Sequence, residues 1–243
     1  MDGYIYVVGI GPGKEDGITK EAERILEQSD IIVGYKTYID LVRDRFPEKE
    51  FFENGMTKEL ERCRKCIELA RSGKNVALIG SGDSGVYGMA SPMLEEAEKT
   101  GFLGVKVIPG VTAALSGGAL LGAPVGHDFA VISLSDRLTS WELIEKRLRL
   151  AAEGQFVIVL YNPSSHKRKD YLQKACDIVL DILPEETCCG IAKNIGREGE
   201  ETQIMTLKEL RDTEVDMFTT VFIGNSDTKN MGDYMVTLRG YRE

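Results

Sequence analysis

The chain has 243 residues, of which 42% are hydrophobic and 28% charged, and it contains 26 glycines. This length and composition are typical of a folded protein with one large or two modest domains. The net charge is −9 and neither half of the chain is basic, which argues against a nucleic-acid partner. The start of the chain has no basic segment of a secretion signal. No apolar run approaches the length of a membrane span, so we expect a cytoplasmic protein without membrane association.

The first half of the chain alternates apolar, strand-like runs with helical patterns. Thr19 is expected to cap the first helix, and Ser91 and Pro92 are expected at the N-cap and first position of the fourth. Strands separated by helices predict a mostly parallel sheet with helices on its faces. The predicted strands are 5–8, 31–34, 75–80 and 105–108, and the predicted helices are 19–28, 41–46, 57–72, 91–100 and 112–121.

The third of these helices contains Cys63 and Cys66, which form a C-x-x-C pair. Such a pair binds metal or exchanges electrons when a second ligand pair or a preceding strand accompanies it, and neither is present. An odd total of five cysteines also argues against a disulfide framework. We therefore expect buried helix thiols and no metal site.

Residues 122–126 are rich in turn formers, and the alternation of strand and helix restarts beyond them. We therefore predict two domains, residues 1–122 and 123–243. Short connections between the later strands predict a mixed sheet in the second domain, so the fold class is α/β. The predicted strands there are 130–134, 156–161, 189–192, 203–206, 218–224 and 234–238, and the predicted helices are 141–153 and 169–183.

Three glycine-rich loops follow predicted strands, at residues 9–13, 80–88 and 109–113. Ligands of such sheets bind at the carboxyl ends of strands. The first loop resembles a dinucleotide fingerprint, but its third glycine has the wrong offset and the helix after it starts late. A nicotinamide dehydrogenase is therefore disfavoured, while a plain tight turn stays an alternative for this loop.

Four polar residues follow predicted strands and have two interpretations each. Asp83 either faces a ligand or caps the next turn, and Thr112 either contacts a ligand or caps a helix. Asn162 and Asn225 lie either at the ligand-binding edge or in ordinary turns.

The order and spacing of the three loops resemble the tetrapyrrole (corrin and porphyrin) methylases, over essentially the whole chain. The resemblance rests on residues 9–13, on Ser81, Gly82 and Asp83 with Val86 three residues further on, and on residues 109–113. Segments 81–90, 121–130, 133–139, 141–142, 161–165 and 196–200 are most similar to the members that methylate C17 of precorrin-3B or cobalt-precorrin-3.

This resemblance implies two α/β domains with the cofactor in the cleft between them, usually in a homodimer. It implies methyl transfer from S-adenosylmethionine to C17 of the tetrapyrrole with ring contraction, in cobalamin biosynthesis, leaving S-adenosylhomocysteine. The nucleophile is an electron-rich carbon of the substrate, so the protein mainly aligns two reactants in a dry cleft. Ring contraction moves protons and needs a general acid or base. Whether the substrate carries cobalt stays open.

Carried over residue by residue, the resemblance implies cofactor contacts from both domains. These are Pro12, Ser81, Gly82, Asp83, Val86, Thr112 and Ala113, with Asn162 and Gly190 from the second domain. The candidates for proton transfer are His127, Asp128 and Asp83, since imidazole titrates near neutral pH; a structural histidine at the domain boundary is the alternative. The candidate clamps for substrate carboxylates are Arg137, Lys193 and Arg197, with solvated surface charge as the alternative.

Other functions stay open within the same fold. A methylase acting on a different corrin carbon or on a diphthamide precursor is the nearest alternative. A tetrapyrrole-binding regulator without activity is disfavoured by the intact glycine loops.

Overall fold

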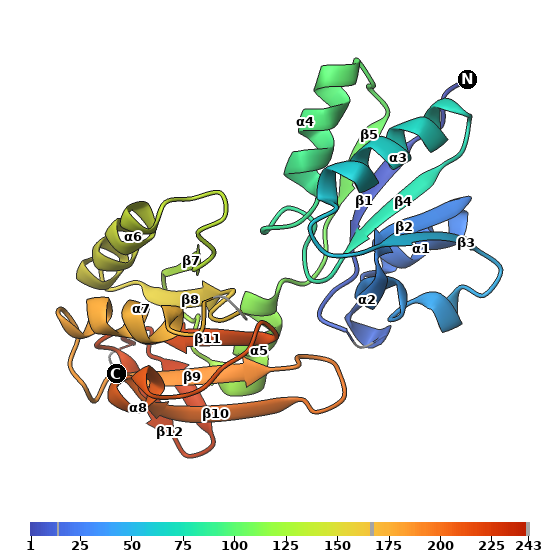
Figure 1. The fold of residues 1–243 in the computed structure, drawn as a ribbon. Helices are drawn as coiled ribbons and strands as arrows, with labels where there is room; N and C mark the ends of the chain where they lie inside the picture. Colours follow the sequence, from blue (N-terminus) through green and yellow to red (C-terminus); the bar gives the residue numbers. More distant parts are fainter. Residues whose placement is uncertain (14, 166–167, 242–243) are drawn as a thin grey trace. The chain divides into compact units, whose positions relative to one another are not determined.

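The computed structural model describes residues 1–13, 15–165 and 168–241, and the chain folds as two compact units, Met1–Ala113 and Ala114–Glu243 (Figure 1). This division precedes the predicted boundary after residue 122. Helix α5 (Ala113–Leu121) accounts for the difference, because it packs within the second unit. A Cβ atom on Gly117 would lie 2.9 Å from Ile195 and 3.2 Å from Ala192, so helix and sheet touch here through a glycine.

The first unit is built on a five-stranded sheet of order β3-β2-β4-β1-β5, in which every pair is parallel. The sequence predicts four of these strands and misses β3, where only Phe51 and Phe52 are apolar between polar residues. The strands are β1 (Ile5–Gly9), β2 (Ile31–Tyr35), β3 (Glu50–Asn54), β4 (Val76–Gly80) and β5 (Val105–Ile108).

Helices cover both faces of this sheet and give the unit three layers (Figure 1). On one face, α3 (Glu59–Arg71) and α4 (Ala90–Thr100) pack on side chains such as Val7 and Leu78. On the other, α1 (Lys20–Gln28) and α2 (Lys36–Ile39) pack on side chains such as Val8 and Ile79. The predicted parallel sheet with helices on its faces is confirmed.

Helix starts were predicted with mixed success. Thr19 Oγ1 accepts a hydrogen bond of 3.1 Å from Ala22 N, which confirms it as the cap of α1. Helix α4, by contrast, already begins at Ala90, whose N–H donates to Ser84 O at 2.9 Å, so Ser91 is not the N-cap. The helix predicted at 41–46 is wrong, because α2 precedes it and only a 3₁₀ turn, Arg43–Arg45, follows.

The second unit has a mixed five-stranded sheet of order β10-β9-β11-β8-β7, as predicted. Only β7 (Phe129–Ser133) and β8 (Val157–Tyr161) pair in parallel. The other strands are β9 (Cys188–Lys193), β10 (Glu201–Thr206) and β11 (Thr219–Ile223). One face is covered by α6 (Trp141–Glu153), α7 (Tyr171–Leu180) and α8 (Leu207–Arg211), and α5 packs on the other.

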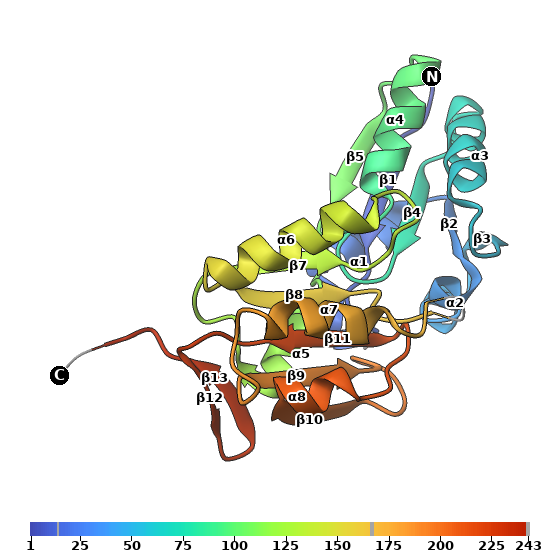
Figure 2. The same ribbon diagram turned by 60° about the vertical axis from the view of Figure 1, so that its left-hand side comes forward.

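A small second sheet completes this unit. It has the order β12-β13-β6 and consists of β6 (Gly122–Ala123), β12 (Thr228–Met231) and β13 (Tyr234–Thr237). The hairpin of β12 and β13 projects from the unit (Figure 2). Thr237 Oγ1 joins it to the chain before β7 by donating to Pro124 O at 2.5 Å. The sequence predicts β13 but neither β6 nor β12.

Cys63 and Cys66 are buried on α3 and pack in the core, which confirms the prediction of buried helix thiols. Burial raises the pKa of the Cys63 thiol to about 11 and that of Cys176 to about 12. Within the described ranges, no three His, Cys, Asp or Glu side chains are grouped to hold a metal ion. In the same ranges, no helix is long and apolar enough to cross a membrane.

These thiols are predicted to be unreactive in the native protein. The thiolate is the nucleophile, and a raised pKa leaves little thiolate at pH 8, so Ellman's reagent should label Cys63, Cys66, Cys176 and Cys189 only after unfolding in guanidinium chloride. Half-exposed Cys188 serves as the internal comparison. Rapid labelling of both Cys63 and Cys66 in the folded state would contradict their burial.

Candidate functional site

The three glycine-rich loops meet at the carboxyl edge of the sheet in the first unit. Gly11 and Gly82 pair through two backbone hydrogen bonds, of 3.0 Å from Gly11 N and 2.7 Å from Gly82 N. The third loop joins them because Gly110 N donates to the Asp83 carboxylate at 2.9 Å. Loops that are far apart in sequence therefore form one connected surface.

Asp83 is the side chain that connects the second and third loops. Its Oδ1 accepts from Gly85 N at 2.8 Å and from Val86 N at 3.1 Å, while its Oδ2 accepts from Gly110 N. Each hydrogen bond to a charged group is worth about 1.5–3 kcal/mol net. Both oxygens thus hold backbone N–H groups, as expected for a carboxylate that shapes a turn.

The glycines of these loops allow three backbones to touch. A Cβ atom on Gly9 would lie 2.6 Å from Gly82 O and 2.8 Å from Gly110 N, and one on Gly110 would lie 2.2 Å from Gly82 O. All three distances are shorter than real Cβ contacts. Buried Ser84 adds a hydrogen bond of 2.9 Å from its Oγ to Ile108 O. Only glycine at positions 9 and 110 permits this packing.

Gly80, at the end of β4, has the opposite surroundings. It is buried, yet a Cβ atom built on it would meet no atom within 4 Å beyond its chain neighbours. Glycines with similarly open surroundings, such as Gly101 and Gly232, lie on the exposed surface. The strand end therefore borders a space that a small group can enter.

The predicted cofactor contacts of the first unit lie on these adjoining loops. A Cβ atom on Gly82 would be 3.8 Å from Thr112 Cα and 3.9 Å from Ala113 N, so the second and third loops are in contact there. The structure therefore brings the following predicted residues onto neighbouring loops of one edge: Pro12, Ser81, Gly82, Asp83, Val86, Thr112 and Ala113.

In the second unit, several predicted residues share one edge of the mixed sheet. Strands β8 and β9 are both antiparallel to β11, which lies between them, so their carboxyl ends lie at the same edge. Asn162 follows β8 there, Lys193 ends β9, and Arg137 follows the parallel strand β7. Asn162 adopts a φ of +54° and donates from Nδ2 to Ser133 Oγ at 2.9 Å.

Two other residues singled out from the sequence, the predicted contact Gly190 and the strand-end residue Asn225, do not lie at that edge. Gly190 lies inside β9, and a Cβ atom on it would be 3.0 Å from Leu121 and 3.2 Å from Met235 Sδ, so it accommodates core packing. Asn225 follows β11, whose direction is reversed, and therefore lies at the opposite edge. There its Nδ2 donates to Gln155 O at 2.7 Å, so Asn225 belongs to a turn, which was the alternative interpretation.

His127 and Asp128 precede β7 and lie at its amino end, away from Asn162. The His127 Nδ1 accepts from Asp128 N at 2.9 Å and lies 3.3 Å from Asp128 Oδ2. A neutral imidazole accepting at Nδ1 carries its proton on Nε2. The His127 side chain is 53% exposed, so this nitrogen is not enclosed by the core.

The predicted carboxylate clamps differ in their surroundings. Lys193 Nζ forms an ion pair of 3.1 Å with Asp216 Oδ2, and the Arg197 guanidinium lies 5.5 Å from the centre of the Phe218 ring. Arg137 lies on the exposed loop after β7. The positive charge at this edge is therefore partly offset by Asp216.

A polar network at the same edge was not predicted from the sequence. Arg168 Nη1 donates to Ser135 Oγ and to Asp136 Oδ1, both at 2.9 Å, and Tyr171 Oη donates to Asp136 Oδ2 at 2.6 Å. The Tyr171 hydrogen bond and the Arg168 charge lower the pKa of Asp136. Arg168 lies in a run of basic residues that is typical of solvated surface, so only the fold reveals its partners.

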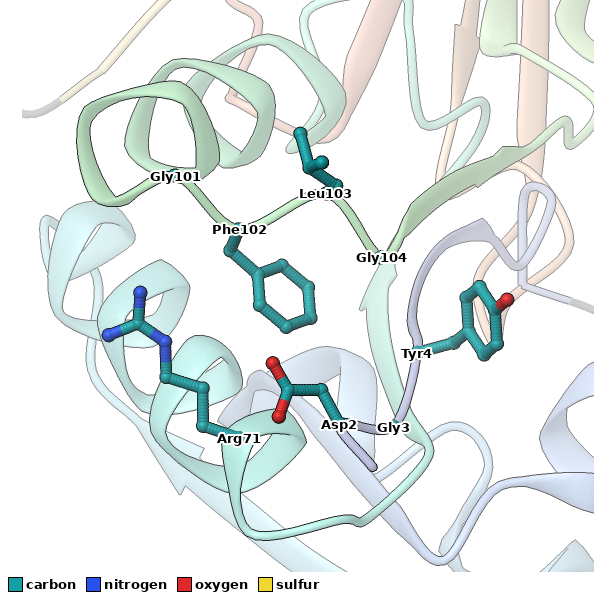
Figure 3. Close-up of a pocket in the computed structure, with 8 residues that line it drawn as sticks. All are labelled: Asp2, Gly3, Tyr4, Arg71, Gly101, Phe102, Leu103 and Gly104. Carbon is teal, nitrogen blue, oxygen red and sulfur yellow. The ribbon is translucent and has the colours of Figure 1, made fainter.

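A pocket of about 370 Å³ in the first unit lies elsewhere (Figure 3). Residues 2–4 and 101–104, which line it with Arg71, directly precede β1 and β5. It therefore belongs to the amino edge of the parallel sheet, opposite to the glycine loops, and we do not assign it to the site.

Residues 4–211 match the tetrapyrrole (corrin/porphyrin) methylases. The chain is 45% identical over 236 residues to the probable cobalt-factor III C(17)-methyltransferase of Salmonella typhimurium, covering 97% of this chain and 98% of that protein. It is 42% identical to the cobalt-factor III methyltransferase of Priestia megaterium, covering 100% of this chain and 46% of that protein. The chain thus spans about half the length of this second relative.

Solved structures share the fold. The crystal structure of the methyltransferase CobJ superposes with a TM-score of 0.90 at 34% identity, covering 97% of this chain and 100% of that one. A uroporphyrin-III C-methyltransferase from Thermus thermophilus, solved with S-adenyl homocysteine, has the same fold at 21% identity and a TM-score of 0.73, covering 91% and 97%. The matches in sequence and structure agree with the three glycine loops, and the chain belongs to the tetrapyrrole (corrin/porphyrin) methylase family.

Proposed function

We propose that this chain is an S-adenosylmethionine-dependent methyltransferase that methylates C17 of a cobalt-carrying tetrapyrrole and contracts its ring in cobalamin biosynthesis. The observation that carries the proposal is the 45% identity, over nearly the full length of both chains, to a probable cobalt-factor III C(17)-methyltransferase. The second relative also acts, by its name, on cobalt-factor III. These names favour a substrate with cobalt, a point that the sequence leaves open.

The carboxyl edge of the first unit fits S-adenosylmethionine. When bound, this cofactor supplies a methyl group on a positively charged sulfur. The loops offer small, uncharged residues such as Ser81, Gly82 and Ala113, which let the backbone approach a ligand closely. The space beside Gly80 has room for a small group. We therefore propose Pro12, Ser81, Gly82, Val86, Thr112 and Ala113 as contacts, with Asp83 acting through the loops that it holds.

In the second unit, we propose that the substrate binds at the sheet edge formed by the carboxyl ends of β7, β8 and β9. Asn162 and the basic residues Arg137, Lys193 and Arg197 lie at this edge. Tetrapyrroles of this kind carry several carboxylates, and arginine binds carboxylates with two parallel hydrogen bonds. Arg137 and Arg197 are the proposed partners, and Lys193 contributes charge that Asp216 moderates. The proposed contact of Gly190 with the cofactor would come from its backbone alone, since Leu121 and Met235 enclose its Cα.

We propose that the protein accelerates the reaction chiefly by holding the two reactants in line. The new bond to C17 forms as the bond from the methyl carbon to sulfur breaks, and no protein nucleophile is needed. For the proton transfer of ring contraction, His127 and Asp83 are both retained as candidates. His127 lies at the amino end of β7, opposite to the proposed substrate edge, and both oxygens of Asp83 already accept backbone N–H groups.

The family resemblance also implies a cytoplasmic homodimer, and we retain both features as proposals. Met231 and Tyr234 on the projecting hairpin are 54% and 58% exposed, and burial of such side chains favours association. Light scattering should then give about twice the chain mass of 26.9 kDa, and a monomeric mass would contradict the dimer.

The proposed reaction is tested by incubating the protein with cobalt-factor III and isotopically labelled S-adenosylmethionine. Mass spectrometry and NMR of the product should locate one labelled methyl group on C17 of a contracted ring. Label on another carbon would indicate a different corrin methylase. In a parallel incubation with a diphthamide precursor, labelling of that precursor with no labelled tetrapyrrole in the first incubation would indicate the other alternative.

The space beside Gly80 predicts a variant that folds but does not bind the cofactor. Gly80→Val places its Cβ atom in open space, so the melting temperature should change by only a few degrees, while the affinity for S-adenosylhomocysteine falls at least about tenfold, or 1.4 kcal/mol. Calorimetric titration measures the affinity. As a matched control, Gly9→Ala forces a Cβ against the other loops and should destabilise the fold by about 1–3 kcal/mol. Unchanged affinity in Gly80→Val would contradict this placement of the cofactor.

Two variants separate proton transfer from loop geometry. If His127 transfers the proton, His127→Gln should lower kcat at least about a hundredfold, the lower limit for general acid–base catalysis, with unchanged affinity for S-adenosylhomocysteine. Asp83→Asn should instead weaken that affinity, because one amide group cannot accept all three N–H groups. Steady-state kinetics and titration measure the two effects. Full activity of His127→Gln would remove His127 from the mechanism.

A further inference from the structure

Tyr87 adopts a φ of +52° in the loop after β4. Bulky residues rarely adopt this left-handed region, whereas glycine enters it freely, and the same loop already contains four glycines. The Tyr87 residue is 57% exposed. A large aromatic residue is therefore more than half exposed at a backbone position where folding alone favours glycine. Strained residues of this kind are concentrated at functional sites.

The backbone on both sides of Tyr87 is fixed. Before it, Gly85 N and Val86 N both donate to Asp83 Oδ1. After it, the chain returns to Ser84, whose carbonyl oxygen accepts from Ala90 N at 2.9 Å. Gly88 packs so closely that a Cβ atom on it would lie 2.4 Å from Ser84 O. Tyr87 is thus an exposed residue of a rigid turn, and the turn fixes the position of its backbone.

We propose that Tyr87 binds the substrate by stacking its ring on the flat, conjugated macrocycle, and that this contact sets the affinity for the tetrapyrrole. The inference rests on the proposed function. Aromatic rings stack in an offset arrangement on other π-systems, and a ring held by a rigid turn loses little freedom on binding. The adenine of the cofactor is the other flat group available. Because Tyr87 lies on the exposed turn, beyond Ser81 and Gly82 at the strand end, the macrocycle is favoured.

The test compares steady-state kinetics of the wild type with Tyr87→Phe, Tyr87→Leu and Tyr87→Gly, using cobalt-factor III and S-adenosylmethionine. Tyr87→Leu and Tyr87→Gly should raise KM for the tetrapyrrole about tenfold or more, the loss expected of one stacked aromatic contact, and leave KM for the cofactor unchanged. Tyr87→Phe keeps the ring and should stay within about twofold of the wild type. Tyr87→Gly should also raise the melting temperature by a few degrees, since it relieves the left-handed backbone.

Tyr4→Leu is the matched control, because Tyr4 is a 46% exposed tyrosine of the same unit that lies before β1, at the amino edge of the sheet. Its kinetics should match the wild type. If the wild type methylates cobalt-factor III but Tyr87→Leu keeps its tetrapyrrole KM, or changes only the cofactor KM, the inference is overturned and the proposed function stands. If the wild type transfers no methyl group to any tetrapyrrole, both fail.

Discussion

The three hydrogen bonds to the Asp83 carboxylate are the constraint on which the first unit's site depends. They hold Gly85 and Val86 of one loop and Gly110 of another, so two loops that follow different strands move as one. The three backbone N–H groups thereby have hydrogen-bond acceptors within the protein and require none from a ligand. The Asp83 carboxylate therefore serves to fix the shape of the loops. The surface that the loops offer to a ligand is formed by small residues and main chain. A site built in this way is preorganised before either reactant arrives.

Much of this organisation was predictable from the sequence because it depends on local pattern. Glycine-rich segments after apolar runs mark strand ends, and in an all-parallel sheet every carboxyl end lies at the same edge. The prediction that three loops form one site follows from that rule, and the family that these loops suggested is confirmed. The capped start of α1 at Thr19 was also predictable, since a cap and its helix are neighbours in sequence.

The remaining features depend on partners that lie far away in the chain. Asn225 was grouped with Asn162 because both follow strands, but β11 runs antiparallel to β8, and no local pattern reveals that direction. The network of Arg168 with Asp136 joins residues 32 positions apart. Strand β3 was missed because two phenylalanines among polar residues are a weak signal, although an edge strand needs few apolar side chains. Helix α5 packs within the second unit through Gly117 and Gly118, whose packing partners, such as Phe222, are distant in sequence.

The contact of backbones at Gly9, Gly82 and Gly110 has an evolutionary consequence. Positions that contribute no side-chain atom are here the least replaceable, since any Cβ at Gly9 or Gly110 would overlap main chain. Side chains around them can diverge with each substrate while the loops keep their shape. We therefore expect these glycine positions to tolerate less change than the side chains around them. Substitutions elsewhere in the loops can alter what the site binds while this contact of backbones is kept.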